Sequence, residues 1–288
     1  TSGTVRAARV GTATRPAGSR NSDRPRAGSA VAELVQEALT RPTPRLLPLG
    51  DAAWTVELGE RIDPAIHHRV TGLGAQIHEL RNTDPLLAGV TDLVPGFRSL
   101  TVHFDSWTTD ASALGQRLLA LARQGHELAV RGRQWLLPVC FDEDFAPDLP
   151  RLCDAKGLSR EAAIALLLAT RLRVYLIGFQ PGFAYMGSLP PALTLPRLAT
   201  PRQRVPARSL AVAGEMCGIY PCDSAGGWNL LGRTPVRLFD PDREDQPAML
   251  AAGDEVQWIA IDRTTHDDLA AKVARGLPRE HFLEASPA

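Results

Sequence analysis

The chain has 288 residues, of which 44% are hydrophobic and 22% charged, and 32 acidic residues balance 32 basic ones. This composition is ordinary for a soluble globular protein and leaves room for one large or two ordinary domains. Zero formal net charge argues against a protein that binds nucleic acid over its whole surface. The sequence contains no run of about 20 apolar residues, so we predict no membrane-spanning helix.

The few lysines and the spacing of the cysteines limit which nucleophiles and metal sites the chain can have. Lys156 and Lys272 are the only lysines, so a lysine nucleophile has few candidates. The four cysteines, at positions 140, 153, 217 and 222, have irregular spacing without a C-x-x-C pair. No signal peptide is recognisable, and we expect a cytoplasmic protein with reduced thiols. No histidine lies between His126 and His266 to complete a metal site, so we interpret the cysteines as buried free thiols and predict no metal site.

Residues 1–44 are predicted to form a disordered tail and a short helix. The first 28 residues have few large apolar side chains and cannot bury enough surface to offset the entropy of ordering. The alternative for this stretch is a basic arm that touches a partner. Residues 29–39 have apolar positions at helical spacing, and Pro42 and Pro44 end that pattern.

Residues 45–142 alternate between strand and helix patterns. Strands are predicted at 54–58, 93–94, 99–104 and 133–141. One amphipathic helix is predicted to begin with Asp63 as the N-cap and Pro64 at the first helical position, and a second to span 108–124. The order β-α-β-β-α-β fits a ferredoxin-like domain. We interpret four histidines of this part as exposed, namely His67, His68, His78 and His103.

Residues 143–173 are predicted to be a helical connector, in which Ser159 caps an apolar helix. Residues 174–265 have short strand patterns between turns rich in Gly and Pro, which is typical of a barrel or a sandwich. The strands expected there are 174–177, 210–213, 228–231, 236–239 and 255–259. The pattern of a terminal helix extends over 262–276. We place the end of the barrel domain at residue 265 and assign residues 266–288 to a C-terminal helix and tail.

Arginine dominates one long stretch of the barrel sequence. Between Glu161 and Glu215 there are six arginines and no Asp, Glu, Lys or His, which points to an anionic ligand or partner surface. Arg202 and Arg204 are two residues apart, so they project from one face of an extended segment, and guanidinium groups suit a carboxylate or phosphate. A solvent-facing rim is the alternative, and we favour contact with a ligand or partner.

The loop 178–187 combines glycines with aromatic residues, so its backbone can approach a ligand closely and its free N–H groups can hold a phosphate or carboxylate. It is not a Walker A loop, because the chain lacks that motif. A plain barrel corner explains the glycines equally well. The residues that we predict to bind substrate or nucleotide are Gly178, Phe179, Pro181, Gly182, Phe183, Arg202, Arg204, Tyr220, Trp228 and Arg233. For Trp228 a place in the core, and for Arg233 an ion pair with Asp240, are the structural alternatives.

Glu215 and Asp223 are the only acidic residues between Glu161 and Asp240. They are therefore the catalytic candidates of this half, for general-base work or magnesium ligation. Without a local histidine, no Ser-His or Cys-His pair can form here. We expect any activity to need a second chain.

The run from Tyr175 to Pro241 resembles the carboxyltransferase C/D subunit family. The matching phrases are GFQPGF at 178–183, TPRQRVP at 200–206, GIYP at 218–221 and GGWNLLGRTP at 226–235, and the likeness extends over about residues 45–262. The family includes the B-type subunit of bacterial ATP-dependent 5-oxoprolinase, the first subunit of split allophanate hydrolase and urea carboxylase systems, and an inhibitor of a sporulation kinase. The resemblance implies an α+β fold, with a ferredoxin-like domain before a cyclophilin-like β-barrel.

Two stretches depart from the family pattern. Members usually have a histidine in the helix before the first barrel strand, where residues 165–169 here read ALLLA. They usually read AGGQTG where residues 213–218 here read AGEMCG.

The resemblance implies three alternative functions. The first is a subunit of an ATP-dependent hydrolase that opens 5-oxoproline to glutamate. Its cofactor would be ATP, with Mg²⁺ as an optional companion. Its partners would be a second subunit with a related barrel, similar to the C-type subunit of 5-oxoprolinase, and a third hydrolase subunit. The second function is a non-catalytic regulator that binds a partner protein, and the third is a subunit of a urea carboxylase or allophanate hydrolase.

Overall fold

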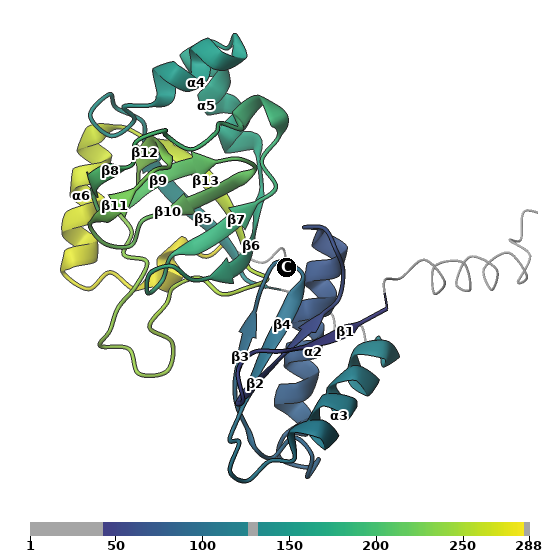
Figure 1. Cartoon of the computed structure of the whole chain (residues 1–288). Coiled ribbons are helices and arrows are strands. Elements are labelled where there is room, and N and C mark those ends of the chain that lie inside the picture. The colour runs from purple at the N-terminus through teal and green to yellow at the C-terminus, as the bar shows by residue number, and fades with distance from the viewer. Residues whose placement is uncertain (1–42, 126–131, 285–288) are drawn as a thin grey trace, which may run out of the picture. The chain divides into compact units, whose positions relative to one another are not determined.

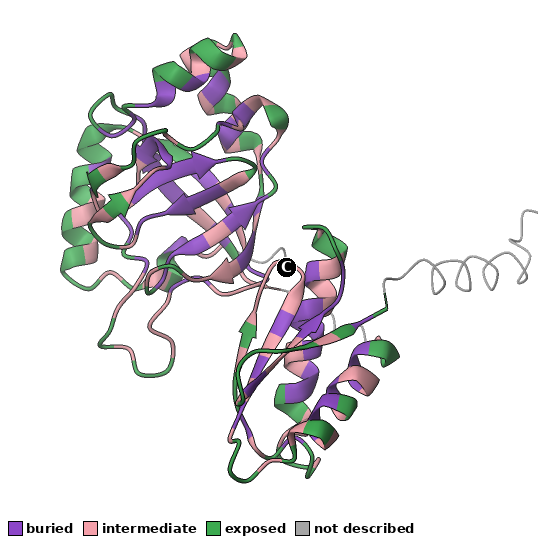
Figure 2. Cartoon of the chain, viewed as in Figure 1, coloured by how far each residue is buried: buried purple, intermediate pink, exposed green. Residues whose placement is uncertain are grey.

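The computed structural model describes residues 43–125 and 132–284. The tail and short helix predicted over residues 1–42 lie outside the described residues. Figure 1 shows the elements in chain order, and Figure 2 shows that buried residues follow the barrel strands and the inner faces of the helices. No helix within the described ranges is long and apolar enough to cross a membrane.

A four-stranded antiparallel sheet with the order β1-β2-β4-β3 begins the described chain. Its elements are β1 (Arg45–Pro48), β2 (Ala53–Glu57), β3 (Val90–Pro95), β4 (Ser99–Phe104) and the helices α2 (Pro64–Leu80) and α3 (Ala111–Gln124). Asp63 caps α2 as predicted, by accepting the N–H of Ala65, and Asp110 caps α3 in the same way. Alternate residues of β4, Leu100 and Val102 among them, are fully buried in one apolar cluster with both helices.

The strand predicted at 133–141 does not complete this sheet. It forms β5 (Gln134–Cys140), which pairs in parallel with β13 (Glu255–Ile261) along its whole length. The edge beside β2 is occupied instead by β1, which was not predicted as a strand. Hydrophobicity explains the difference, because Trp135, Leu137 and Val139 are at most 1% exposed. An edge strand cannot bury three such side chains so completely, whereas the interior of a barrel can.

The second part is a closed barrel with the strand order β10-β7-β6-β13-β5-β12-β9, which confirms the predicted barrel. Its remaining strands are β6 (Leu172–Ile177), β7 (Ala184–Gly187), β9 (Ser209–Ala213), β10 (Met216–Ile219) and β12 (Asn229–Arg233), and a separate pair joins β8 (Arg202–Val205) to β11 (Ser224–Gly226). The strand predicted at 236–239 is wrong. This segment makes only an isolated bridge between Phe239 and Ala248, and its apolar side chains Val236 and Leu238 are buried without a strand ladder.

The helices of the second part are α4 (Leu149–Lys156), α5 (Arg160–Ala169) and α6 (Arg263–Ala274), with short 3₁₀ turns η1 (Pro191–Leu193) and η2 (Arg279–Phe282). Ser159 caps α5 as predicted by accepting the N–H of Ala162. Along β9, Leu210 and Val212 belong to the barrel core, whereas Ala211 and Ala213 belong to a smaller cluster on the other face of the strand. That outer cluster contains three of the predicted site residues, Phe183, Tyr220 and Trp228.

His67 is fully buried, so the prediction of an exposed side chain is wrong for this histidine. The Nε of Arg173 donates to its Nδ1 at 3.0 Å, and its Nε2 lies 2.7 Å from the carbonyl oxygen of Tyr175. Since Nδ1 accepts, Nε2 carries the proton and donates to Tyr175. Burial lowers the pKa of His67 to about 4, and the positive charge of Arg173 adds to this effect. His78 is exposed as predicted, while His68 and His103 are half-buried.

Candidate functional site

Five aromatic side chains from three segments form one cluster on the outer face of the barrel wall. We call Phe179, Phe183, Tyr185, Tyr220 and Trp228 the aromatic cluster. The ring of Phe183 is central, with centroid distances of 4.9 Å to Tyr185, 5.2 Å to Tyr220 and 5.5 Å to Trp228. The rings meet edge to face, the arrangement that the aromatic quadrupole favours. Four of the twelve predicted site residues are thus brought together.

Two glycines of the family phrases let these rings pack. A Cβ atom at Gly226 would lie 2.2 Å from the hydroxyl of Tyr220, and one at Gly218 would lie 2.8 Å from the ring of Phe183. Neither distance is sterically possible, so the glycines next to the aromatic positions are required by ring packing rather than by backbone freedom. Trp228 is 5% exposed and belongs to this small core, which agrees with the structural alternative considered for it.

The glycine-rich loop connects β6 to β7 and carries backbone strain. Phe179 has φ +67°, in the left-handed region that a bulky residue rarely adopts, and 63% of its surface is exposed. Strain of this kind concentrates at functional sites. The N–H groups of Phe179 and Gly182 donate to no acceptor within the described residues. Phe179 is exposed whereas Gly182 is buried, and binding of an anion by this loop stays a prediction.

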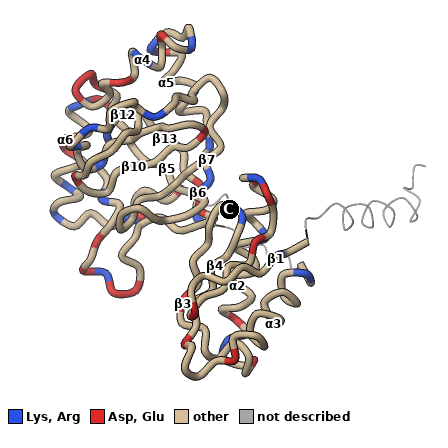
Figure 3. Tube along the Cα trace, in the orientation of Figure 1, with Lys and Arg blue, Asp and Glu red and all other residues tan. Residues whose placement is uncertain are grey.

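Arg202 and Arg204 are neutralised by carboxylates of this same chain. Arg202 donates to Asp148 at 2.7 Å, and Arg204 binds Asp223 at 2.6 Å. The inference of uncompensated charge is therefore wrong for both residues. It failed because the acidic partners lie outside the acid-free stretch and approach only in the fold. Figure 3 shows acidic and basic positions interleaved over the barrel.

Arg197 was missed by the sequence analysis and differs from the other arginines of this stretch. It is exposed, and its guanidinium lies 6.0 Å from the ring centroid of Trp228. Within the described residues it makes no hydrogen bond and no ion pair. Burial raises the pKa of the Tyr185 and Tyr220 hydroxyls, and the nearby charge of Arg197 acts in the opposite direction. The available cation at the aromatic cluster is thus Arg197, which no feature of the sequence distinguishes from its neighbours.

Tyr185 was also missed, although the sequence carried a signal for it. Phe183 and Tyr185 are two residues apart at the start of a strand, so their side chains leave it on the same face. Tyr185 contacts both Phe183 and Trp228 and is half-buried.

The two acidic candidates, Asp223 and Glu215, have different surroundings. The carboxylate of Asp223 accepts the N–H of Ala207 and the guanidinium of Arg204, and these two contacts lower its pKa. A carboxylate held in this way is a weak base, so the catalytic role of Asp223 stays a prediction that its contacts do not favour. Glu215 is exposed in the turn between β9 and β10. In the two described ranges no three His, Cys, Asp or Glu side chains come together to hold a metal.

The remaining predicted residues have structural surroundings. Arg233 lies over the ring of Phe145 at 4.8 Å rather than pairing with Asp240, and its buried Nε has no hydrogen-bond partner within the described residues. Burial lowers the pKa of the Arg233 guanidinium, and the positive charge of Arg208 adds to this effect. Pro181 is exposed at the tip of the glycine-rich loop. Cys222 is exposed and donates weakly to Gln180, so the expectation of a buried thiol is wrong there, whereas Cys140 and Cys217 are buried as predicted.

Comparison with known proteins places this geometry in a family. Residues 44–250 match the family described as carboxyltransferase domain, subdomain C and D. The chain belongs to this family. The resemblance predicted from the sequence phrases is therefore confirmed.

This carboxyltransferase C/D chain is 33% identical to the B-type subunit of 5-oxoprolinase from Bacillus subtilis (strain 168), over 74% of its own length and 91% of that protein. The crystal structure of TTHA0988 is 37% identical with a TM-score of 0.62, and the match covers 73% of this chain and 40% of that one. Urea carboxylase of Kluyveromyces lactis is 19% identical with a TM-score of 0.65, over 80% of this chain and 23% of that enzyme, which shows the fold alone. The chain thus spans less than half of both solved proteins.

The groups of this surface that are exposed are the ring of Phe179 and the guanidinium of Arg197. A guanidinium beside an aromatic ring can hold a small anion. Within the described residues no three metal-binding side chains gather here, so a preformed all-protein magnesium site is absent from this part of the chain. Binding and orientation are therefore what this surface can supply by itself.

Proposed function

We propose that this chain is the B-type subunit of an ATP-dependent 5-oxoprolinase and acts with a second subunit that carries a related barrel. The observation that carries the proposal is the 33% identity over 91% of the corresponding 5-oxoprolinase subunit from Bacillus subtilis. A match across nearly the whole relative supports a shared role more strongly than a match to one domain would.

The site supports a binding role within that complex. We propose that the carboxylate of 5-oxoproline accepts hydrogen bonds from Arg197, while its ring lies against the exposed face of the aromatic cluster. Arg197 suits this role because its guanidinium makes no hydrogen bond or ion pair within the described residues. The acid-base groups and the ATP site are proposed to come from the partner subunits, since neither Asp223 nor Glu215 lies in a catalytic arrangement.

The test is to coexpress this chain with the subunits encoded beside it and to measure ATP-dependent formation of glutamate from 5-oxoproline. We expect activity from the assembled complex and none when this chain is left out. Arg197→Ala should raise KM for 5-oxoproline about tenfold or more, the loss expected for one hydrogen bond between charged groups. Arg275→Ala removes an exposed arginine outside the aromatic cluster, so it is the matched control and should leave KM unchanged. An assembled complex that produces no glutamate contradicts the proposal.

A non-catalytic regulator is the second candidate function. It is favoured by the exposed ring of Phe179 on a strained loop. If the assembled complex is inactive, this candidate predicts that Phe179→Ser weakens binding to a partner protein. The likeness to urea carboxylase shows only the fold, so it does not favour the third function.

A further inference from the structure

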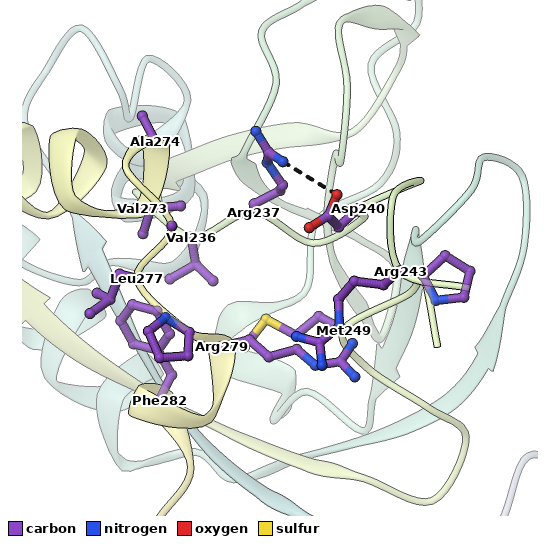
Figure 4. A pocket seen from close by; sticks show the side chains of 13 residues that line it. Val236, Arg237, Asp240, Arg243, Met249, Val273, Ala274, Leu277, Arg279 and Phe282 are labelled. Atoms are coloured by element: carbon purple, nitrogen blue, oxygen red, sulfur yellow. Dashed lines mark hydrogen bonds and ion pairs between the residues drawn. The ribbon is translucent and has the colours of Figure 1, made fainter. Parts of the chain in front are cut away.

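A cavity of about 270 Å³ lies between the segment that follows β12 and the C-terminal end of α6 (Figure 4). One wall is formed by residues 236–249 and the other by residues 273–282. None of the predicted site residues and no member of the aromatic cluster lines it.

One side of the cavity is apolar. Val236, Met249 and Phe282 line it and are at most 6% exposed, and the half-buried Val273 and Leu277 extend the same surface. Figure 4 shows Val273, Leu277 and Phe282 on the side away from Asp240 and Arg243. A charged group placed against this apolar side would lose its hydration without gaining a partner.

The opposite side carries an excess of positive charge. Three guanidinium groups, from Arg237, Arg243 and Arg279, face a single lining carboxylate, that of Asp240. Arg279 is largely a structural tether, since it donates to the carbonyl oxygens of Gln246 at 2.8 Å and Ala248 at 3.2 Å. Asp242, Glu244 and Asp245 of the same loop are exposed and do not line the cavity.

Arg237 and Arg243 retain donors for a ligand. Arg237 approaches Asp240 at 3.4 Å, and Arg243 approaches Glu280 at 3.7 Å. Both contacts are longer than the roughly 2.7–2.9 Å of a charge-assisted hydrogen bond. The guanidinium plane presents paired N–H groups that match the two oxygens of a carboxylate.

We propose that this cavity binds a small monocarboxylate with a compact apolar body. The carboxylate accepts hydrogen bonds from Arg237 and Arg243, and the body packs against Met249, Leu277 and Phe282. A dicarboxylate such as glutamate is excluded, because its second charge would lie against the apolar side. A branched aliphatic acid has this chemistry in full, whereas 5-oxoproline shares the carboxylate and the compact size but carries a polar lactam amide, and binding measurements separate these two sources. The inference does not rest on the proposed function, since it concerns the chain without partner or nucleotide.

The test is isothermal titration of the full chain with isocaproate, with 5-oxoproline and with the neutral isocaproamide. We expect one isocaproate site per chain and at least tenfold weaker binding of the amide than of isocaproate. Replacing both arginines, Arg237→Ala with Arg243→Ala, should weaken carboxylate binding at least tenfold. Arg275→Ala is the matched control, because Arg275 is an exposed neighbour that does not line the cavity. Binding of 5-oxoproline that depends on the same two arginines would identify the lactam acid as the ligand source, and binding of isocaproate alone would identify an aliphatic acid.

Methionine methyl NMR locates the site independently of any variant. The chain has three methionines, and only Met249 lines the cavity. Isocaproate should shift the methyl signal of Met249 and leave those of Met186 and Met216 in place. The proposal is overturned if neither carboxylate binds, if the amide or glutamate binds as tightly as isocaproate, if the double variant keeps its affinity, or if the Met249 signal does not move.

Discussion

Arg202 and Arg204 lie two residues apart on β8, yet their ion pairs have different surroundings. The Arg202 side chain is 29% exposed and that of Asp148 10%, and Asp148 also accepts the N–H of Leu230 at 2.7 Å. The side chains of Arg204 and Asp223 are 78% and 45% exposed. Water screens the second pair, so its contribution to stability is small, whereas loss of Arg202 leaves a buried carboxylate without its counter-charge.

We therefore predict that Arg202→Ala lowers the free energy of unfolding by about 2 kcal/mol, the range for a hydrogen bond to a charged group. Arg204→Ala should lower it by no more than about 0.5 kcal/mol. Urea denaturation of the two variants against the parent chain measures the difference. Equal losses would show that burial of Asp148 is not what distinguishes the pairs.

His67 gives the protein a pH dependence whose sign follows from its pKa. The folded-state pKa is about 4, below the ordinary value of 6.5, so between these values the unfolded chain binds more protons than the folded one. Stability is therefore fully present above about pH 6.5 and falls as the pH drops toward 4, by up to about 1.4 kcal/mol per pH unit and on the order of 3 kcal/mol in total. Replacing His67 with Gln keeps an N–H for Tyr175 but removes the titration.

The measurement is the unfolding free energy of the parent, His67→Gln and His78→Gln at a series of pH values from 4 to 7, a range set by the two pKa values. The difference in unfolding free energy between the parent and His67→Gln should vary with pH, and its slope should correspond to the uptake of up to about one proton on unfolding. His78 is exposed, so its variant should follow the parent. A parent and His67→Gln with parallel profiles would mean that the buried imidazole does not titrate in this window.

At the scale of elements, the glycine-rich loop is held by backbone packing as well as by its aromatic rings. Gly182 has φ +79°, and a Cβ atom there would lie 2.8 Å from the Cβ of Phe239 and 2.9 Å from the carbonyl oxygen of Leu238. Gly157, which follows α4, has φ +64° but open space around the corresponding position. The two glycines share the conformational requirement and differ in packing.

Gly157→Ala should destabilise the chain by about 1–2 kcal/mol, the cost of a left-handed conformation for a residue with a Cβ. Gly182→Ala should cost at least about 1 kcal/mol more, because residues 238–239 must move to relieve the clash. Thermal and urea unfolding of both variants provide the comparison. Indistinguishable losses would remove the proposed packing between the loop and residues 238–239.

At the scale of the whole molecule, the sequence predicted those features that depend on neighbouring residues. Helix starts with Asp63 and Ser159 at the N-cap are confirmed, and so is the barrel predicted over 174–265, although β5 joins it from outside that range. Features that depend on distant residues were not predictable in this way. Whether β5 joins the sheet or the barrel depends on which partner can bury Trp135. Likewise, the acids that neutralise Arg202 and Arg204 lie outside the stretch between Glu161 and Glu215. Counting charges within that stretch therefore could not distinguish Arg197 from Arg202 and Arg204.

The place of β5 leads to a prediction about which part of the chain can fold alone. β5 lies between β13 and β12, so a fragment that starts at residue 143 would open the barrel and expose two strand edges. It would also lose Trp135, Leu137 and Val139 from the core, at about 1.5–3 kcal/mol for each buried side chain. That sum is comparable with the roughly 5–15 kcal/mol that stabilises a whole domain. We therefore expect residues 143–288 to lack a cooperative thermal transition and dispersed amide NMR signals, and residues 132–288 to show both. Both fragments lack the contacts with His67, so a difference in their thermal unfolding must come from β5. A cooperative transition in the shorter fragment would mean that the barrel closes without this strand.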